Sequence, residues 1–175
     1  MTQNADTISQ KYIVIDSCIL EYLLNRDMND SITQQLGYWC NNVFTLSVSE
    51  VSYAELVDGA HLDKETKVID LLDKYHSFAI SKRIITGAGK IGSVYKQEFP
   101  TEKTVSLGDK ILAATSIIYG APLVTANVKD FPHPFFKTLK DKNIIYMKDN
   151  KRRMINIALL FPNYEYLTYA FNTRK

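Results

Sequence analysis

Short apolar, β-branched runs alternate along this chain with stretches of helical periodicity. The runs are KYIVID (11–16), VFTLSV (43–48), SFAI (77–80), APLVTAN (121–127) and NIIYMK (143–148). Runs of this length and composition are typical of strands buried on both faces. Strands that alternate with helices predict a mostly parallel sheet covered by helices, which is an α/β fold.

The helical stretches differ in strength. Residues 109–120 (DKILAATSIIYG) give the clearest pattern and predict a buried helix, whereas the glycines weaken the helix expected over 87–99. In the helix expected over 47–60, Ser47 and Glu50 match the capping-box spacing. Glu50 is therefore predicted to have a structural role.

Length and composition predict one domain with two attached ends. We expect a frayed tail over 1–10, an α/β domain over 11–150, and an added basic and aromatic segment over 151–175 that is helical and packs on the domain or a partner. The net charge of +2 permits a nucleic-acid partner without requiring one. Two cysteines, no long apolar run and no signal-peptide pattern predict a cytoplasmic protein without a membrane span.

Four acidic residues stand where a ligand crevice is expected. In open α/β sheets ligands bind beyond the carboxyl ends of the strands, where the strand order reverses. Asp16 ends the first strand, Asp130 follows the strand 121–127, and Asp109 and Glu55 lie on helices that flank the sheet. Each has a structural alternative: a helix cap for Asp16, a favourable helix dipole for Asp109, and a loop or flank position for the other two.

Carboxylates that gather at one edge repel each other unless a cation accompanies them. An all-oxygen set of this kind favours Mg²⁺ or Mn²⁺. Thr125 and Asn127 share the turn before Asp130 and could assist. The three histidines accompany no ligand motif, which disfavours zinc.

Three blocks of the sequence resemble the PIN-domain nucleases, and VapC-like toxins of type II toxin–antitoxin systems in particular. They are YIVIDSCIL (12–20), TLSVSEVSYAELVDGA (45–60) and LGDKILAATSIIYGAPLVTANVKDF (107–131). The third block is the most specific. The resemblance spans residues 11 to about 148 and implies a three-layer α/β/α fold with a central, mostly parallel sheet.

By this resemblance Asp16 matches the first metal-binding acid, Glu55 the acid of the AEL segment, and Asp109 the third acid. The fourth ligand is either the residue at Asn127, an acid in some members, or Asp130 of the DF pair; we favour Asp130.

Ser17-Cys18 departs from the usual TN or SN after the first acid. Ser17 is a supporting polar residue here, and the Cys18 thiol is a poor ligand for a hard metal.

The resemblance implies cleavage of RNA with one or two Mg²⁺ or Mn²⁺ ions, an antitoxin that masks the site, and a homodimer. Lys110 and Lys129 are candidate RNA contacts, with Lys82 and Arg83 as further candidates.

Two other functions are alternatives for an α/β domain with acids at its strand ends. A receiver-type phosphotransfer domain would carry paired acids after its first strand and an acid after its third, and IDSC and SFAISK lack them. A catalytically degenerate PIN domain that binds RNA or a protein is the alternative to a nuclease, and retention of all four acids argues against it.

Overall fold

The computed structural model describes residues 11–61, 64–98, 105–131 and 133–173, so the expected tail over 1–10 lies outside the described residues. The strands are β1 (Lys11–Ile15), β2 (Phe44–Ser49), β3 (His76–Phe78), β4 (Leu123–Thr125), β5 (Phe136–Lys148) and β6 (Lys151–Pro162). The helices are α1 (Ser17–Leu24), α2 (Asn29–Cys40), α3 (Glu50–Asp58), α4 (Glu65–Leu72), α5 (Lys82–Glu98), α6 (Leu107–Tyr119) and α7 (Tyr164–Asn172), with a 3₁₀ turn η1 (Val128–Asp130). None of these helices is long and apolar enough to cross a membrane.

The strands of the described chain form one sheet in the order β3-β2-β1-β4-β6-β5. The four strands from β3 to β4 are parallel, and β6 pairs antiparallel with both β4 and β5. The predicted α/β fold with a mostly parallel sheet is therefore confirmed. Since β2 and β3 lie on one side of β1 and β4 lies on the other, the strand order reverses between β1 and β4. A ligand crevice is expected at the carboxyl ends of these two strands.

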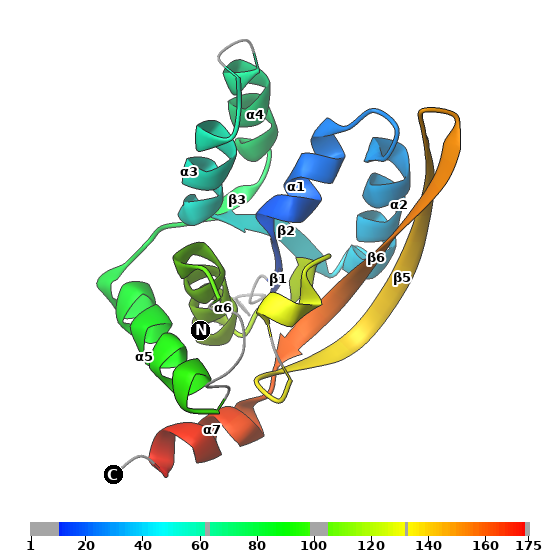
Figure 1. Cartoon of the computed structure of the whole chain (residues 1–175). Helices are drawn as coiled ribbons and strands as arrows, with labels where there is room; N and C mark the ends of the chain where they lie inside the picture. Colours follow the sequence, from blue (N-terminus) through cyan, green and yellow to red (C-terminus); the bar gives the residue numbers. More distant parts are fainter. Residues whose placement is uncertain (1–10, 62–63, 99–104, 132, 174–175) are drawn as a thin grey trace, which may run out of the picture.

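Helices cover both faces of the sheet (Figure 1). Ile13 and Ile15 of β1 pack in a core with α1, α2 and α4, whereas Val14 packs in a second core with α5, α6 and α7. Alternate side chains of a strand point to opposite faces, so this one buried strand anchors both layers. The result is the three-layer α/β/α arrangement that the sequence predicted.

Glycines let α5 pack closely against α6. A Cβ atom on Gly87 would lie 3.3 Å from the Ala114 Cβ, and one on Gly92 would lie 3.1 Å from the Lys110 Cδ. These glycines made the helix prediction weak, yet α5 runs unbroken from Lys82 to Glu98. Close packing against α6 compensates for their low helix propensity and fixes the helix that carries Asp109.

The segment over 151–162 corrects the predicted helical tail. It is strand β6, which lies inside the sheet between β4 and β5, and only α7 is helical as expected. The strands β5 and β6 are joined at Asp149 and Asn150, with φ angles of 52° and 57°. Two positive φ values define a type I′ hairpin turn, which Asp and Asn tolerate better than most residues. The boundary predicted after residue 150 thus falls inside a turn, and β5 begins well before residue 143.

The predicted capping box at Ser47 is also wrong. Ser49 is the N-cap of α3, and its hydroxyl accepts from the Val51 amide at 3.5 Å. Ser47 is still in β2, where its hydroxyl donates to the Ile13 carbonyl at 3.0 Å. The carboxylate of Glu50 accepts from the Ile80 amide at 2.8 Å, so Glu50 has a structural role with a different partner.

The end of α6 gives a test of local backbone strain. Gly120 is the C-cap, with φ 62° and ψ 29°, and a Cβ there would be in ordinary contact with the Tyr164 Oη at 3.5 Å. Gly120→Ala should therefore lower the free energy of unfolding by about 1–2 kcal/mol through backbone conformation alone. Gly89→Ala, in the interior of α5 with open space around it, should raise it by about 0.5–1 kcal/mol. Urea denaturation measures both; shifts of the same sign would contradict this account.

Candidate active site

Asp16 occupies the N-cap position of α1, but its carboxylate makes no capping hydrogen bond. The residue is 2% exposed, and its carboxylate accepts from the Thr125 hydroxyl at 2.5 Å, the Cys18 thiol at 3.0 Å and the Ser17 hydroxyl at 3.3 Å. The capping alternative therefore does not explain Asp16. Its carboxylate is held between β1 and β4, where the strand order reverses.

Cys18 acts as a hydrogen-bonding residue beside Asp16. Burial is the main cause of a strongly raised pKa of the thiol, and the charge of Asp16 adds to it. The thiol thus stays protonated and donates to Asp16, while its sulfur accepts from the Ala126 amide at 3.4 Å. Cys18 therefore joins the start of α1 to the end of β4.

The turn after β4 carries three of the predicted residues. Thr125 is fully buried, and its hydroxyl accepts from the Asn127 amide at 2.8 Å while it donates to Asp16. Asn127 is exposed, and its backbone amide provides its contact with Thr125 of the site. Asp130, on η1, is half-buried and close enough to Asp109 to act on its charge.

Asp109 lies in the first turn of α6, whose N-cap is Ser106. The Ser106 hydroxyl accepts from the Asp109 amide at 3.0 Å and donates to its carboxylate at 2.6 Å. Burial raises the pKa of Asp109, the Ser106 hydrogen bond opposes the rise, and the charges of Asp130 and Asp16 add to it. Asp109 therefore has a place at a helix N-terminus and faces the other acids as well.

Glu55 extends from α3 toward the same acids. Shielding of its carboxylate raises its pKa, a hydrogen bond with Ser17 lowers it, and the charges of Asp109 and Asp16 raise it further. The residue as a whole is exposed, so only the carboxylate end is shielded. A Cβ on Gly108 would fall 1.8 Å from the Glu55 Oε1. Only glycine leaves room for this carboxylate against the start of α6.

The charges of Asp16 and Asp109 thus act on Glu55, and those of Asp16 and Asp130 act on Asp109; these four residues are the acid cluster. Such repulsion is relieved by a cation, and the oxygen donors suit a hard one. Within the described ranges, however, no three His, Cys, Asp or Glu side chains stand together as a ready metal-binding group. The donors fit an ion of the Mg²⁺ type, which is commonly bound by one or two carboxylates and completed by water and phosphate oxygens.

Ser106, Gly108, Tyr22 and Tyr95 belong to the site but were not predicted. Burial raises the pKa of the Tyr95 hydroxyl and Asp109 adds to the rise. For Tyr22 burial is again the main cause, and Cys18, Glu21, Tyr146 and Asp16 add to it. Ser106 could have been found from its capping spacing to Asp109. Tyr22 follows Asp16 by six residues and Tyr95 precedes Asp109 by fourteen, and no motif at these spacings indicates them.

The predicted RNA-contacting lysines lie close to the acids in sequence but differ in exposure. Lys110 is half-buried and lies along α5 at Gly92. Lys129 is exposed on η1 beside Asp130, and Lys82 and Arg83 are exposed at the start of α5.

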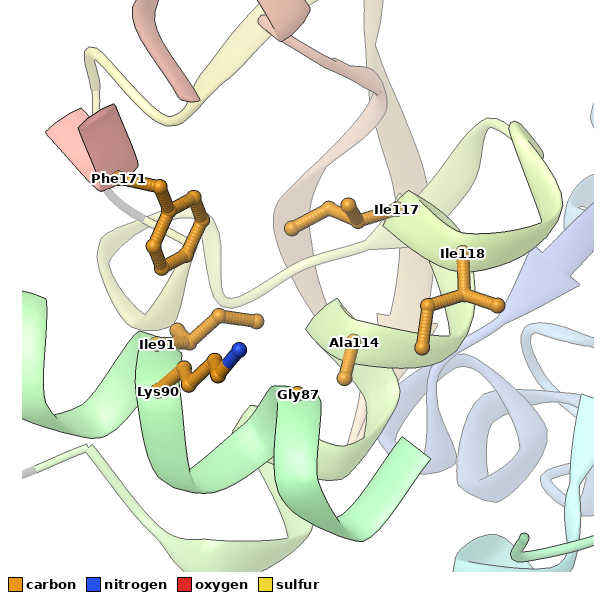
Figure 2. A pocket seen from close by; sticks show the side chains of 7 residues that line it. All are labelled: Gly87, Lys90, Ile91, Ala114, Ile117, Ile118 and Phe171. Atoms are coloured by element: carbon orange, nitrogen blue, oxygen red, sulfur yellow. The ribbon is translucent and has the colours of Figure 1, made fainter. Parts of the chain in front are cut away.

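Two hollows lie near α3 and α6. One of about 430 Å³ lies between α1, α3 and α4, and Glu21, Glu55, Lys64 and Lys67 are among its lining residues. The other, of about 330 Å³, is mostly apolar and lies between α5, α6 and α7 (Figure 2). The first adjoins the acid cluster through Glu55. None of the four acids lines the second.

Comparison with solved structures identifies proteins of the same fold. A toxin–antitoxin complex from Klebsiella pneumoniae matches with a TM-score of 0.54 and 24% identity, over 70% of this chain and 92% of that one. VapBC2 from Rickettsia felis, bound to a DNA fragment from its promoter, matches with a TM-score of 0.58 and 22% identity, over 69% and 90%. No protein-family model and no curated protein matches the chain. The fold is PIN-like, as the sequence resemblance implied.

The raised pKa of Asp109 predicts how its substitution changes stability. An acid whose pKa is raised on folding contributes stability at low pH that is lost as the pH rises through the folded-state pKa. Asp109→Asn should therefore raise the melting temperature of metal-free protein near neutral pH, and the gain should shrink toward pH 4. Differential scanning fluorimetry in EDTA measures this, with Asp70→Asn on exposed α4 as the control. A gain that is equal at both pH values would contradict it.

Proposed function

We propose that this protein is a Mg²⁺- or Mn²⁺-dependent endoribonuclease that hydrolyses RNA phosphodiester bonds, and that it is the toxin of a toxin–antitoxin pair. One observation carries the proposal: Asp16 and Asp130, which follow β1 and β4, and Glu55 and Asp109 on the flanking helices α3 and α6 are linked to one another through their charges. A bound cation would relieve this repulsion. The PIN-like fold supports the same conclusion.

The residues around the acids have distinct roles in this proposal. Asp16 and Asp109 would hold the ion, with Glu55 and Asp130 beside them. Bound Mg²⁺ lowers the pKa of a coordinated water and neutralises charge on the leaving oxygen. Thr125 and Cys18 fix the Asp16 carboxylate, while Ser106 fixes that of Asp109. This support keeps the carboxylates in place before an ion arrives.

A cognate antitoxin is the proposed protein partner. Both solved structures described above are toxin–antitoxin proteins. The hollow between α1, α3 and α4 adjoins Glu55 and would let a segment of a partner cover the acid cluster. We further propose a homodimer that acts on cytoplasmic RNA.

A second candidate is a catalytically inactive module that binds RNA or a protein. One observation favours it, namely that the described residues contain no ready group of three metal-binding side chains. The two candidates differ in metal-dependent cleavage.

Purified protein should cleave RNA when Mg²⁺ is added. Asp16→Asn and Asp109→Asn should each reduce the rate at least about 100-fold, because each removes charge that the ion needs. Asp70→Asn removes the same charge from exposed α4 and should cleave like the wild type. Gel analysis of the products measures the cleavage rates. In cells, expression of the wild type should inhibit growth and expression of the two site variants should not, which would separate a toxin from other nucleases. Equal cleavage by all four proteins would reject the mechanism.

Gly108→Ala tests the position of Glu55. The added methyl group would displace a flexible carboxylate end and not the backbone, so the variant should fold normally. Its cleavage rate should fall about 100-fold because the carboxylate moves by more than an ångström. Gly89→Ala, with open space around it, is the matched control. A fully active Gly108→Ala protein would remove Glu55 from the proposed site.

A further inference from the structure

The β5–β6 hairpin extends past the edge of the sheet at which the acids lie. Thr125, the last residue of β4, pairs with Ala158 of β6. Because β6 runs antiparallel to β4, its residues from Ile157 back to Lys151 continue beyond the carboxyl end of β4, paired only with β5. The hairpin therefore rises from the edge that carries Asp16 and Asp130, beside α2 (Figure 1).

Positive charge is concentrated on this hairpin. Residues 136–162 hold seven of the 21 lysines and arginines but only two of the 19 acids. The net charge of the whole chain is +2, so the remainder of the chain is net negative. The one ion pair found in the described residues joins Lys137 to Glu165 at 3.9 Å, with both side chains largely exposed. The cations nearer the turn have no acidic partner in the described chain.

Several of these cations share one face of the hairpin. Lys148 pairs with Lys151, Tyr146 with Arg153, and Lys142 with Ile157. Residues that are directly opposite each other point to the same side, and like charges in such pairs are destabilising. The hairpin thus retains a repulsive lysine pair close to its turn. This repulsion would be relieved by an anionic partner.

The same face continues toward the acid cluster. Ile144 and Ile157 on it are buried in the core formed with α1 and α2. Tyr146 and Tyr22 of α1 both pack against this core. Two half-buried tyrosines therefore accompany this face, and Tyr22 is on the helix that begins directly after Asp16.

We propose that this cationic face, consisting of Lys142, Tyr146, Lys148, Lys151 and Arg153, binds single-stranded RNA and leads it to the acid cluster. The identification of RNA as the ligand rests on the proposed function. The acids themselves repel phosphates, so affinity for RNA must come from cations elsewhere. A flexible RNA strand can follow the row of cationic side chains along the hairpin. The tyrosines add surfaces on which bases can stack, and an acidic protein partner would not need such surfaces.

The test is RNA binding by the full chain, measured apart from cleavage. Fluorescence anisotropy with a short labelled RNA strand of mixed sequence is recorded in EDTA, over a series of salt concentrations. The combined variant Lys148→Gln, Lys151→Gln and Arg153→Gln should bind at least about tenfold more weakly. Its slope of log affinity against log salt should be smaller by about 2, because three phosphate contacts are lost. Tyr146→Leu should weaken binding at least about fivefold with little change in the salt slope.

The matched control is Lys74→Gln, Lys90→Gln and Lys96→Gln, which removes three exposed charges from α5 and from the turn after α4. It should bind RNA like the wild type, and circular dichroism verifies the fold of each variant. Equal loss of binding in both triple variants would overturn the proposal, as would binding of a polyglutamate peptide in place of RNA. Strong hairpin-dependent binding without cleavage in Mg²⁺ would contradict the proposed function and leave this inference intact.

Discussion

The hydrogen bond from Thr125 to Asp16 joins the two strand ends on which the site depends. A buried carboxylate is costly unless polar groups replace the water it loses. Asp16 is 2% exposed and receives donors from Thr125, Cys18 and Ser17. These donors come from the start of α1 and the end of β4, so they also fix how the two segments meet. The position of the acid and the local structure therefore depend on each other.

The placement of Asp109 and Glu55 near Asp16 lowers the folding stability of the protein. Asp109 and Glu55 have raised pKa values because their carboxylates are shielded and lie near other acids. Ser106 and Ser17 each offset part of that cost with a hydrogen bond. Gly108 permits the approach of Glu55 where any other residue would block it. Conflict of this kind between stability and placement is typical of functional sites.

Much of the fold and of the acid cluster could be predicted from the sequence because both depend on local patterns. The apolar runs ending at Asp16 and near Asp130 indicated parallel strands, and strand ends indicate where ligands bind. The hairpin was not predicted because residues 151–153 are basic and exposed, so the start of β6 shows no apolar alternation. The sequence feature that indicates the hairpin is the Asp149-Asn150 pair, which forms a turn between two strands. The predicted boundary between the domain and a tail falls at this turn.

Other parts of the site could not be predicted, since they depend on tertiary contacts. Two serines precede α3, and the sequence pattern selected Ser47, which in the fold bonds to the neighbouring strand β1. The proximity of Tyr146 to Tyr22 follows from packing of the hairpin against α1. The contact between Glu55 and Gly108 joins two helices that are far apart in sequence, so no spacing rule indicates it.

We propose that the acid cluster is a single site for a hard divalent cation. Crystals grown with Mn²⁺ test this proposal through anomalous difference density collected near the manganese absorption edge. We expect a strong peak beside Asp16 and Asp109, and its loss in crystals of the Asp109→Asn variant. A Mn²⁺-saturated crystal without density at these carboxylates, or with density only elsewhere on the protein, would contradict it.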